Sequence, residues 1–170
     1  ERTGLPFDNA GEQIMLENVY NRYLGSISAA DENSITLSDS SKSILKNYIV
    51  TVVKGKGVTQ WRYVSGVNGK KITVDEPWDI IPDSESTVLI TGCFDNIAIY
   101  NNSFDCFKNF AETSHTATTG VEVYGNTHNL FIKGNSMKNM NYGFRIVSHY
   151  KYLDDEENGV FWSYFDDNKI

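Results

Sequence analysis

The C-terminal half of the chain carries a pattern of apolar and asparagine positions that repeats every 33 residues. Residues 96–104, 129–137 and, more loosely, 162–170 align, and three columns recur in them. The columns are Ile99, Ile132 and Phe165; then Asn102, Asn135 and Asn168; then Phe104, Met137 and Ile170. An asparagine column between two apolar columns predicts that the three segments occupy equivalent places in a repeating fold.

A shorter repeat lies between these segments. Residues 142–146 resemble residues 119–123, which lie 23 positions earlier. The periods of 33 and 23 residues agree if the basic coil has about 23 residues and each coil also carries an insertion of about ten. The insertions would be at different corners of successive coils. The insertions are then residues 108–118 and residues 149–158.

Coils of this length with several short strands predict an all-β fold, a parallel solenoid. The apolar columns would stack inward between coils about 4.8 Å apart. An asparagine at a fixed corner could adopt the left-handed conformation and bond through its amide to the asparagines above and below. We therefore expect the asparagine column to form a structural ladder, with the first apolar column buried beside it.

Inward stacks and asparagine ladders of this kind recur in the pectate-lyase-like superfamily, which residues 94–170 and an earlier segment, residues 14–20, resemble. The resemblance implies a right-handed parallel β-helix, but no single activity, because the superfamily includes lyases, hydrolases, epimerases, phage tailspikes and non-enzymatic surface proteins. Three or four coils are few for a solenoid, whose ends need covering. We expect the C-terminal end to expose apolar columns unless further β-helix coils, from the same parent chain or another chain, cover it. The start at Glu1, without methionine, suggests an excised or processed chain.

Residues 21–91 do not follow the coil pattern and predict an inserted antiparallel β-meander or small barrel. The β-helix would then consist of residues 1–20 and 92–170. Short strands bounded by turn residues are expected at residues 23–28, 34–37, 48–53, 59–67, 71–74 and 87–91. Asn68 and Gly69, between two of these strands, are a strong hairpin signal.

Within this segment, the stretch Gly-Lys-Gly-Val-Thr-Gln-Trp-Arg-Tyr is followed by Pro-Trp-Asp and Pro-Asp-Ser. This combination resembles an insertion found in some bacterial and phage β-helix proteins. We expect Trp78, which follows a proline, to plug the inserted module rather than to bind a ligand.

Composition favours β-structure and narrows the range of partners. Aromatic residues make up 13% of the 170 residues, and 13 glycines help to separate short apolar segments. Fifteen basic against 22 acidic residues give a net charge of −7, which argues against nucleic-acid binding, since phosphate contacts need clustered lysine and arginine. No apolar run approaches the roughly 18 residues of a membrane helix, so no membrane insertion is expected. Cys93 and Cys106 could form one bridge in an oxidising compartment or stay two buried thiols.

No cofactor is expected, because the motifs of common cofactor and nucleophile sites are missing. Residues 55–57 lack the spacing of a phosphate-binding loop. The spacing of His115, His128 and His149 is not that of a zinc site. No Gly-x-Ser-x-Gly elbow occurs. These absences remove most nucleotide-binding, metallopeptidase and serine-esterase functions.

Glu122 and Arg145 are the first catalytic candidates. On residues 119–123 and 142–146, alternation points the apolar side chains inward, Ile146 among them, and leaves Glu122 and Arg145 stacked outward on successive coils. The resemblance implies the floor of a saccharide groove, where polysaccharide lyases of the superfamily carry acidic and basic residues. A solvent-exposed ion pair is the structural alternative.

The insertion after residue 147 supplies further candidates. Four consecutive acids, Asp154, Asp155, Glu156 and Glu157, could hold Ca²⁺. The run could instead supply a carboxylate pair, an acid and a base, for glycoside hydrolysis. Asp154, Asp155 and His149 are the catalytic candidates of this insertion. A solvated acidic loop is the alternative. The residues expected to share one shallow cleft are Glu122, Arg145, His149 and Tyr150, with His115 at its edge.

Aromatic side chains that face outward suit a saccharide, because sugar rings stack on aromatic faces through their C–H surfaces. Tyr100, Tyr124 and Tyr164 are at positions expected to face outward. The candidates for substrate binding are Tyr124, Tyr150, Tyr152, Trp162 and His115. Trp162 replaces the asparagine of the other coils, and capping a corner is its alternative role.

These observations predict a polysaccharide-directed β-helix protein, a carbohydrate-active hydrolase or lyase, or part of one. A non-catalytic carbohydrate-binding or cell-surface module is the alternative, and a phage or structural spike element is a further alternative. The resemblance implies an extracellular or cell-surface location and a polysaccharide partner.

Overall fold

The structure, a computed structural model, describes residues 12–18, 21–106, 118–147 and 159–170. These residues form fourteen β-strands and no helix. None of them therefore forms a helix that is long and apolar enough to cross a membrane. The chain divides into two compact units, Tyr20–Cys93 and the combination of Glu1–Val19 with Phe94–Ile170.

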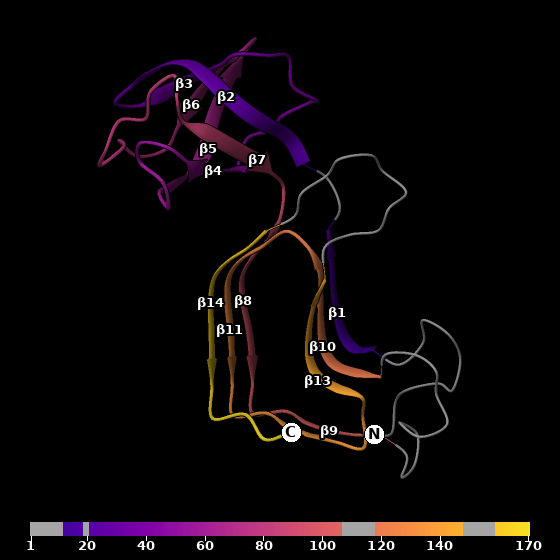
Figure 1. Cartoon of the computed structure of the whole chain (residues 1–170). Coiled ribbons are helices and arrows are strands. Elements are labelled where there is room, and N and C mark those ends of the chain that lie inside the picture. Colours follow the sequence, from indigo (N-terminus) through magenta and orange to yellow (C-terminus); the bar gives the residue numbers. More distant parts are fainter. Residues whose placement is uncertain (1–11, 19–20, 107–117, 148–158) are drawn as a thin grey trace. The chain divides into compact units, whose positions relative to one another are not determined.

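The unit that contains Phe94–Ile170 pairs its strands in parallel throughout its described residues. One sheet consists of β1 (Glu12–Asn18), β10 (Thr119–Gly125) and β13 (Tyr142–Val147). A second sheet consists of β8 (Phe94–Tyr100), β11 (Thr127–Lys133) and β14 (Val160–Asp166). A third, two-stranded sheet consists of β9 (Ser103–Asp105) and β12 (Ser136–Lys138). Figure 1 shows the two larger sheets facing each other, with the smallest sheet crossing below them.

The chain passes through these three sheets in a constant order, as a repeating coil requires. From β8 it continues through β9 and β10, returns to the same sheets in β11, β12 and β13, and enters the first again in β14. Ile132 is paired with Ile99 on one side and with Phe165 on the other. Val121 is paired with Phe144. Both repeat registers predicted from the sequence are therefore confirmed.

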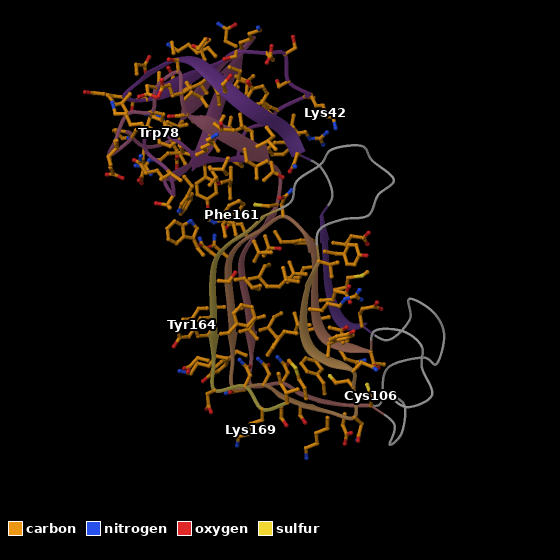
Figure 2. All side chains as sticks on the ribbon, in the orientation of Figure 1. Lys42, Trp78, Cys106, Phe161, Tyr164 and Lys169 are labelled. Atoms are coloured by element: carbon orange, nitrogen blue, oxygen red, sulfur yellow. The ribbon has the colours of Figure 1, made fainter. Side chains whose placement is uncertain are left out.

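Inward-facing apolar side chains fill the space between the sheets of this unit (Figure 2). The buried members of this core are Leu16, Ile99, Val121, Val123, Leu130, Ile132 and Met137. Gly120 makes the packing possible, because a Cβ at this position would lie 2.7 Å from the Gly143 carbonyl oxygen and 2.6 Å from the Met137 sulfur.

The last strands of the two larger sheets do not bury all of their predicted inward side chains. Phe165 was expected to be buried like Ile99 and Ile132, but its exposed fraction is 40%. Ile146, expected to face inward, is 55% exposed, and Ile170 is 76% exposed. The predictions for Phe165 and Ile146 are wrong because no described strand pairs with the outer edge of β14 or β13, the last strands of their sheets, to cover these side chains. The expected exposure of apolar columns at this end is confirmed.

The asparagine ladder is present. Nδ2 of Asn102 donates to Oδ1 of Asn135 at 3.0 Å, and Nδ2 of Asn135 donates to Oδ1 of Asn168 at 2.9 Å. The backbone N–H groups of Asn102 and Asn135 donate to the same two oxygens. The left-handed conformation belongs instead to the preceding residues, whose φ angles are 53° in Asn101, 67° in Gly134 and 49° in Asp167. The corner is therefore turned one residue before the ladder.

The unit Tyr20–Cys93 is a closed antiparallel barrel. Its strands are β2 (Asn21–Asp31), β3 (Ser34–Leu37), β4 (Ile49–Lys54), β5 (Trp61–Asn68), β6 (Lys71–Val74) and β7 (Thr87–Thr91). Their order around the barrel is β2-β3-β6-β5-β4-β7. The predicted hairpin between β5 and β6 is present, with a φ of 59° at Gly69. Its turn lies one residue later than predicted, at Gly69 and Lys70, because Asn68 ends β5 and pairs with Lys71. The sequence predicted either an antiparallel meander or a small barrel, and the structure shows the barrel.

One continuous apolar core fills the barrel. Alternate strand residues supply it, among them Ile27, Ile35, Val50, Val64, Ile72 and Ile90. Trp78 is 4% exposed and packs in this core, as predicted. It lies in the connection between β6 and β7 and not in a strand.

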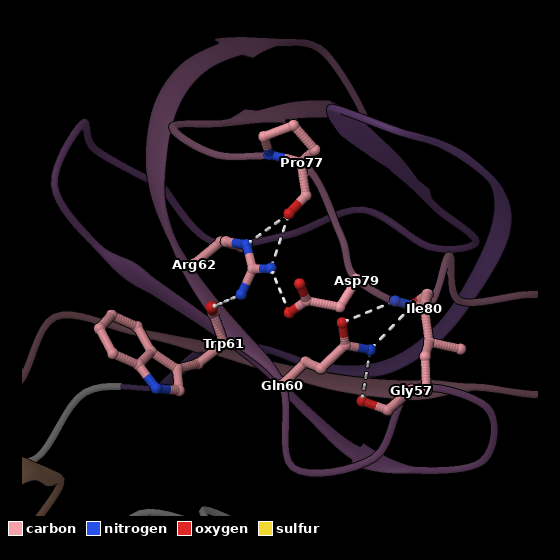
Figure 3. Close-up of polar contacts among 7 residues, drawn as sticks. All are labelled: Gly57, Gln60, Trp61, Arg62, Pro77, Asp79 and Ile80. Atoms are coloured by element: carbon pink, nitrogen blue, oxygen red, sulfur yellow. Dashed lines mark hydrogen bonds and ion pairs between the residues drawn. The ribbon is translucent and has the colours of Figure 1, made fainter.

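The Gln-Trp-Arg and Pro-Trp-Asp stretches meet at one edge of the barrel (Figure 3). Nε2 of Gln60 donates to the Ile80 carbonyl at 2.8 Å, and its Oε1 accepts from the Ile80 N–H at 2.9 Å. Nε and Nη2 of Arg62 donate to the Pro77 carbonyl at 2.9 and 2.6 Å. Nη2 also lies 2.8 Å from Oδ2 of Asp79. These contacts fasten the β6–β7 connection to β5, which explains why the two stretches occur together.

Candidate functional site

A row of aromatic side chains lies on the outer face of the sheet β8–β11–β14. Leu130 and Ile132 belong to the core, so alternation turns Phe131 outward. Tyr164 is the register partner of Phe131 on β14, and the two rings stack with centroids 5.2 Å apart and planes 8° apart. The Tyr100 ring lies 6.5 Å from the Phe131 ring. Tyr100, Phe131 and Tyr164 are called the outer aromatic row below.

The outer aromatic row is open to solvent. The exposed fractions are 56% for Tyr100, 38% for Phe131 and 50% for Tyr164. Figure 2 shows Tyr164 on the side of β14 that faces away from the core. Aromatic side chains offer a large contact area at a low conformational-entropy cost, because they have only two rotatable side-chain bonds. The row can therefore pack against a flat apolar surface such as the face of a sugar ring.

An ion pair borders the outer aromatic row. Nζ of Lys133 lies 2.8 Å from Oδ2 of Asp166, and the two side chains are 39% and 41% exposed. The register places Tyr100, Lys133 and Asp166 opposite one another on the three strands. The hydrogen bond to Asp166 raises the pKa of Lys133, and the hydrogen bonds from Lys133 and Tyr164 lower the pKa of Asp166. Both groups stay charged at neutral pH and offer polar contacts beside the aromatic rings.

A buried histidine lies on the same sheet. His128 is 1% exposed, and its Nδ1 lies 3.4 Å from Oδ1 of Asp95. Burial lowers the pKa of His128, and the Asp95 carboxylate opposes this effect. The imidazole is therefore neutral at pH 7 and is shielded from solvent. These properties fit a structural side chain better than a general base that must meet substrate.

Glu122 and Arg145 form a pair across β10 and β13, but the carboxylate does not line an open groove. Nη1 of Arg145 lies 3.3 Å from Oε1 of Glu122. The side chain of Glu122 is 1% exposed, against 34% for Arg145. The expected position on an open groove floor is therefore wrong. Alternation along β10 predicted which face of the sheet Glu122 is on, but not how far its side chain is buried. Glu122 lies on the central strand of the sheet, between Met15 and Arg145.

Glu122→Gln is expected to stabilise the protein at neutral pH. Burial is the main cause that raises the pKa of Glu122, and the charge of Arg145 opposes it. A carboxyl whose pKa is higher in the folded state makes stability fall as pH rises from the unfolded-state pKa, about 4.3, through the folded-state pKa. Urea unfolding at pH 4 and at pH 7 should show this fall in the wild type and a smaller fall in the variant.

Glu85→Gln is the matched control for that comparison, because Glu85 is exposed and belongs to the barrel unit. Its unfolding free energy should follow the wild type at both pH values. If the pH dependence of Glu122→Gln equals that of the wild type, Glu122 does not bind its proton more tightly in the folded state.

Most other candidate residues lie outside the described residues. They are His115, His149, Tyr150, Tyr152, Asp154, Asp155, Glu156 and Glu157. Their roles in catalysis, substrate binding and Ca²⁺ binding stay predictions, as does the cleft that they would share with Glu122. Within the part of the chain that is described, no group of three or more histidine, cysteine, aspartate or glutamate side chains could hold a metal ion.

Two predicted substrate-binding residues are described. Tyr124 is half-buried on β10. Trp162 is 51% exposed and has a φ of 56°, close to the values of Asn96 and Asn129 in the preceding coils. Trp162 therefore takes the place of a left-handed asparagine and exposes its indole two residues before Tyr164. Binding by either residue stays a prediction.

Cys93 and Cys106 form no disulfide bond and stay thiols. Cys106 is 2% exposed, and burial raises the pKa of its thiol, which keeps it protonated at neutral pH. Cys93 is only half-buried. The sequence left two alternatives, one disulfide bridge or two buried thiols. The structure has two thiols, of which only Cys106 is buried.

The sequence prediction placed Tyr100 and Tyr164 outward but missed Phe131, Lys133 and Asp166. The signal was present in the 33-residue repeat, which aligns Phe131 with Tyr164 and Lys133 with Tyr100. The aromatic residues at outward positions of the repeat therefore indicate the row from the sequence alone.

No family model and no curated protein matches the chain. Among solved structures it is similar to the tailspike protein gp49 from Pseudomonas phage LKA1, at 11% identity over 93% of this chain and 30% of that chain, with a TM-score of 0.39. It is also similar to the tailspike gp61 of Pseudomonas phage phi297, at 11% identity over 80% of this chain and 26% of that chain, with a TM-score of 0.38. The chain thus spans less than a third of the length of either.

Proposed function

We propose that this protein binds a polysaccharide along the outer aromatic row without cleaving it, as a non-catalytic module of a surface or spike-type β-helix. The observation that carries the proposal is the stacked, solvent-exposed pair Phe131 and Tyr164 on a parallel sheet, with an ion pair beside it. It applies to the unit Phe94–Ile170 by itself.

The chemistry of a sugar chain matches this surface. Its ring faces carry C–H groups that pack on aromatic rings, and its hydroxyl groups can bond to Lys133 and Asp166 at the border. Burying apolar ring surface stabilises a complex by about 25 cal/mol per Å². The net charge of −7 disfavours a strongly anionic polymer. A neutral or weakly charged polysaccharide is the partner that fits best.

The described residues favour binding over cleavage. Glycoside hydrolysis uses two carboxyl groups on either side of the scissile bond. Glu122 is the one described carboxylate among the predicted catalytic candidates, and it is buried and paired with Arg145. The hydrolase or lyase function would depend on Asp154 and Asp155, which lie outside the described residues.

We also infer the type of β-fold of this unit, what packs on its C-terminal end, and where the protein is located. The constant order of the three parallel sheets supports a parallel β-helix, right-handed by its resemblance to pectate-lyase-like proteins. The exposed apolar columns at Phe165 and Ile170 support the packing of further β-helix coils there. A polysaccharide partner supports an extracellular or cell-surface location.

Tyr164→Ala is expected to weaken polysaccharide binding about tenfold or more. The substitution removes the exposed face of the Phe131–Tyr164 stack, and a loss of about 1.4 kcal/mol of apolar contact corresponds to one factor of ten in affinity. Affinity is measured by titrating the whole chain against a panel of neutral and acidic polysaccharides. The polymers are recovered afterwards and assayed for new reducing ends, which we expect to be absent.

Tyr142→Ala is the matched control, because Tyr142 is 49% exposed but lies on β13, in the other large sheet. It should bind as the wild type does. Equal affinity of the Tyr164→Ala variant and the wild type for every polymer bound would remove the outer aromatic row as the site. New reducing ends that accumulate with time would show an enzyme instead.

A further inference from the structure

A pocket of about 210 Å³ opens on the barrel unit. The residues that line it are Trp61, Arg62, Tyr63, Asp75 and Glu76. Val64 is buried in the barrel core, so alternation along β5 turns Trp61 and Tyr63 to the outside. Their rings meet edge to face, with centroids 5.3 Å apart and planes 87° apart. The pocket therefore has one aromatic wall of fixed geometry.

Two acidic side chains, Asp75 and Glu76, also line the pocket. Oδ1 of Asp75 accepts the Tyr63 N–H at 2.8 Å, and the Asp75 N–H donates to the Tyr63 carbonyl at 3.0 Å, which holds the Asp75 carboxylate beside Tyr63. Glu76 is exposed and makes no hydrogen bond or ion pair with the described residues. The charge of Arg62 is matched by Asp79 at 2.8 Å. The pocket therefore presents acceptors and negative charge.

Aromatic and acidic side chains together select for a ligand that has an apolar face and hydrogen-bond donors but no negative charge. A pocket of about 210 Å³ lies below the roughly 300–1,000 Å³ of sites for drug-sized ligands, so it suits one ring and not a long chain. A Ca²⁺ ion, which takes six to eight oxygen ligands, does not fit two carboxylates of which one already holds a backbone N–H. We propose that this pocket binds a single non-anionic pyranose unit, preferentially an amino sugar. The site is independent of the outer aromatic row, which lies in the other unit.

Three monosaccharides that share one ring and differ in charge test the proposal. Glucosamine, glucose and glucuronate are titrated into the ¹⁵N-labelled whole chain, and the Trp61 indole N–H and the Tyr63 backbone N–H are followed by NMR. Glucosamine should bind about fivefold more tightly than glucose, the size expected for one exposed charge pair. Glucuronate should shift neither signal. Equal shifts with glucuronate, or no shift with any of the three, would overturn the proposal.

Two substitutions separate the charge from the ring contact. Glu76→Gln should reduce glucosamine affinity about fivefold, to the level of glucose, while leaving glucose affinity unchanged. Trp61→Phe should weaken the binding of both glucosamine and glucose. The Tyr63 N–H signal reports this binding, because the variant lacks the Trp61 indole. Glu85→Gln and Tyr142→Ala are controls that should leave both affinities unchanged. If Ca²⁺ shifts the same signals and competes with glucosamine, the pocket is a cation site and the proposal is wrong.

Discussion

Replacing Asn135 with leucine is expected to lower the free energy of unfolding by about 3–5 kcal/mol. Oδ1 of Asn135 accepts both the backbone and the side-chain N–H of Asn102, and its Nδ2 donates to the Ile99 carbonyl at 3.0 Å and to Asn168 at 2.9 Å. Leucine has a similar size but no polar atom, so buried groups lose their partners at about 1–3 kcal/mol each. Urea unfolding of the whole chain measures the loss.

Asn102→Leu is the matched control, because Asn102 forms one end of the ladder and is less buried than Asn135. The Asn102 side chain only donates, so its removal leaves Oδ1 of Asn135 with a backbone donor. This substitution should cost about 1–2 kcal/mol. An equal loss at Asn102 and Asn135 would contradict the interpretation that the middle amide stabilises the ladder more than this end does.

The ladder was predictable from the sequence because a stacked fold repeats its contacts at the period of its coil. The 33-residue period was enough to place β8, β11 and β14 side by side. The left-handed residue was assigned one position too late. Asn101, Gly134 and Asp167 share this conformation but not a residue type, so they form no column in the sequence.

Depth was the property that alternation could not give. A period of two tells which face a side chain takes, but not what covers that face. Glu122 was placed on the face opposite Val121 and Val123, yet it is buried. Phe165 was placed inward, yet it is 40% exposed, because inward means buried only where another coil follows.

The barrel was predicted as strands but not as an arrangement. Turn residues bounded each strand, and the β5–β6 hairpin followed from Asn68 and Gly69. Closure depends on pairs such as β3 with β6 and β2 with β7, which join segments distant in sequence. No local pattern encodes such pairs, so the sequence left meander and barrel as alternatives. The contact of Arg62 with Pro77 is of the same non-local kind.

Arg62→Ala is expected to destabilise the protein by about 2–4 kcal/mol, through the barrel unit. The guanidinium donates twice to the Pro77 carbonyl and once, at 2.7 Å, to the Trp61 carbonyl. It also lies 5.4 Å from the centre of the Trp78 ring. The Arg62 side chain is 13% exposed, so the guanidinium itself is largely shielded from water, although Pro77 is exposed. Their loss releases the connection that holds Trp78 in the barrel core.

The carbonyl contacts, not the ion pair, should account for this loss. Asp79 is 81% exposed, so Asp79→Asn should change the unfolding free energy by no more than about 0.5 kcal/mol. Arg62→Lys should recover less than half of the loss, because a single ammonium cannot reproduce the planar fork that reaches two carbonyls. Tryptophan fluorescence during urea unfolding follows Trp78 when Trp61 and Trp162 are replaced by phenylalanine in the reference protein and in every variant. If Asp79→Asn costs as much as Arg62→Ala, the ion pair fastens the connection and the carbonyl contacts are secondary.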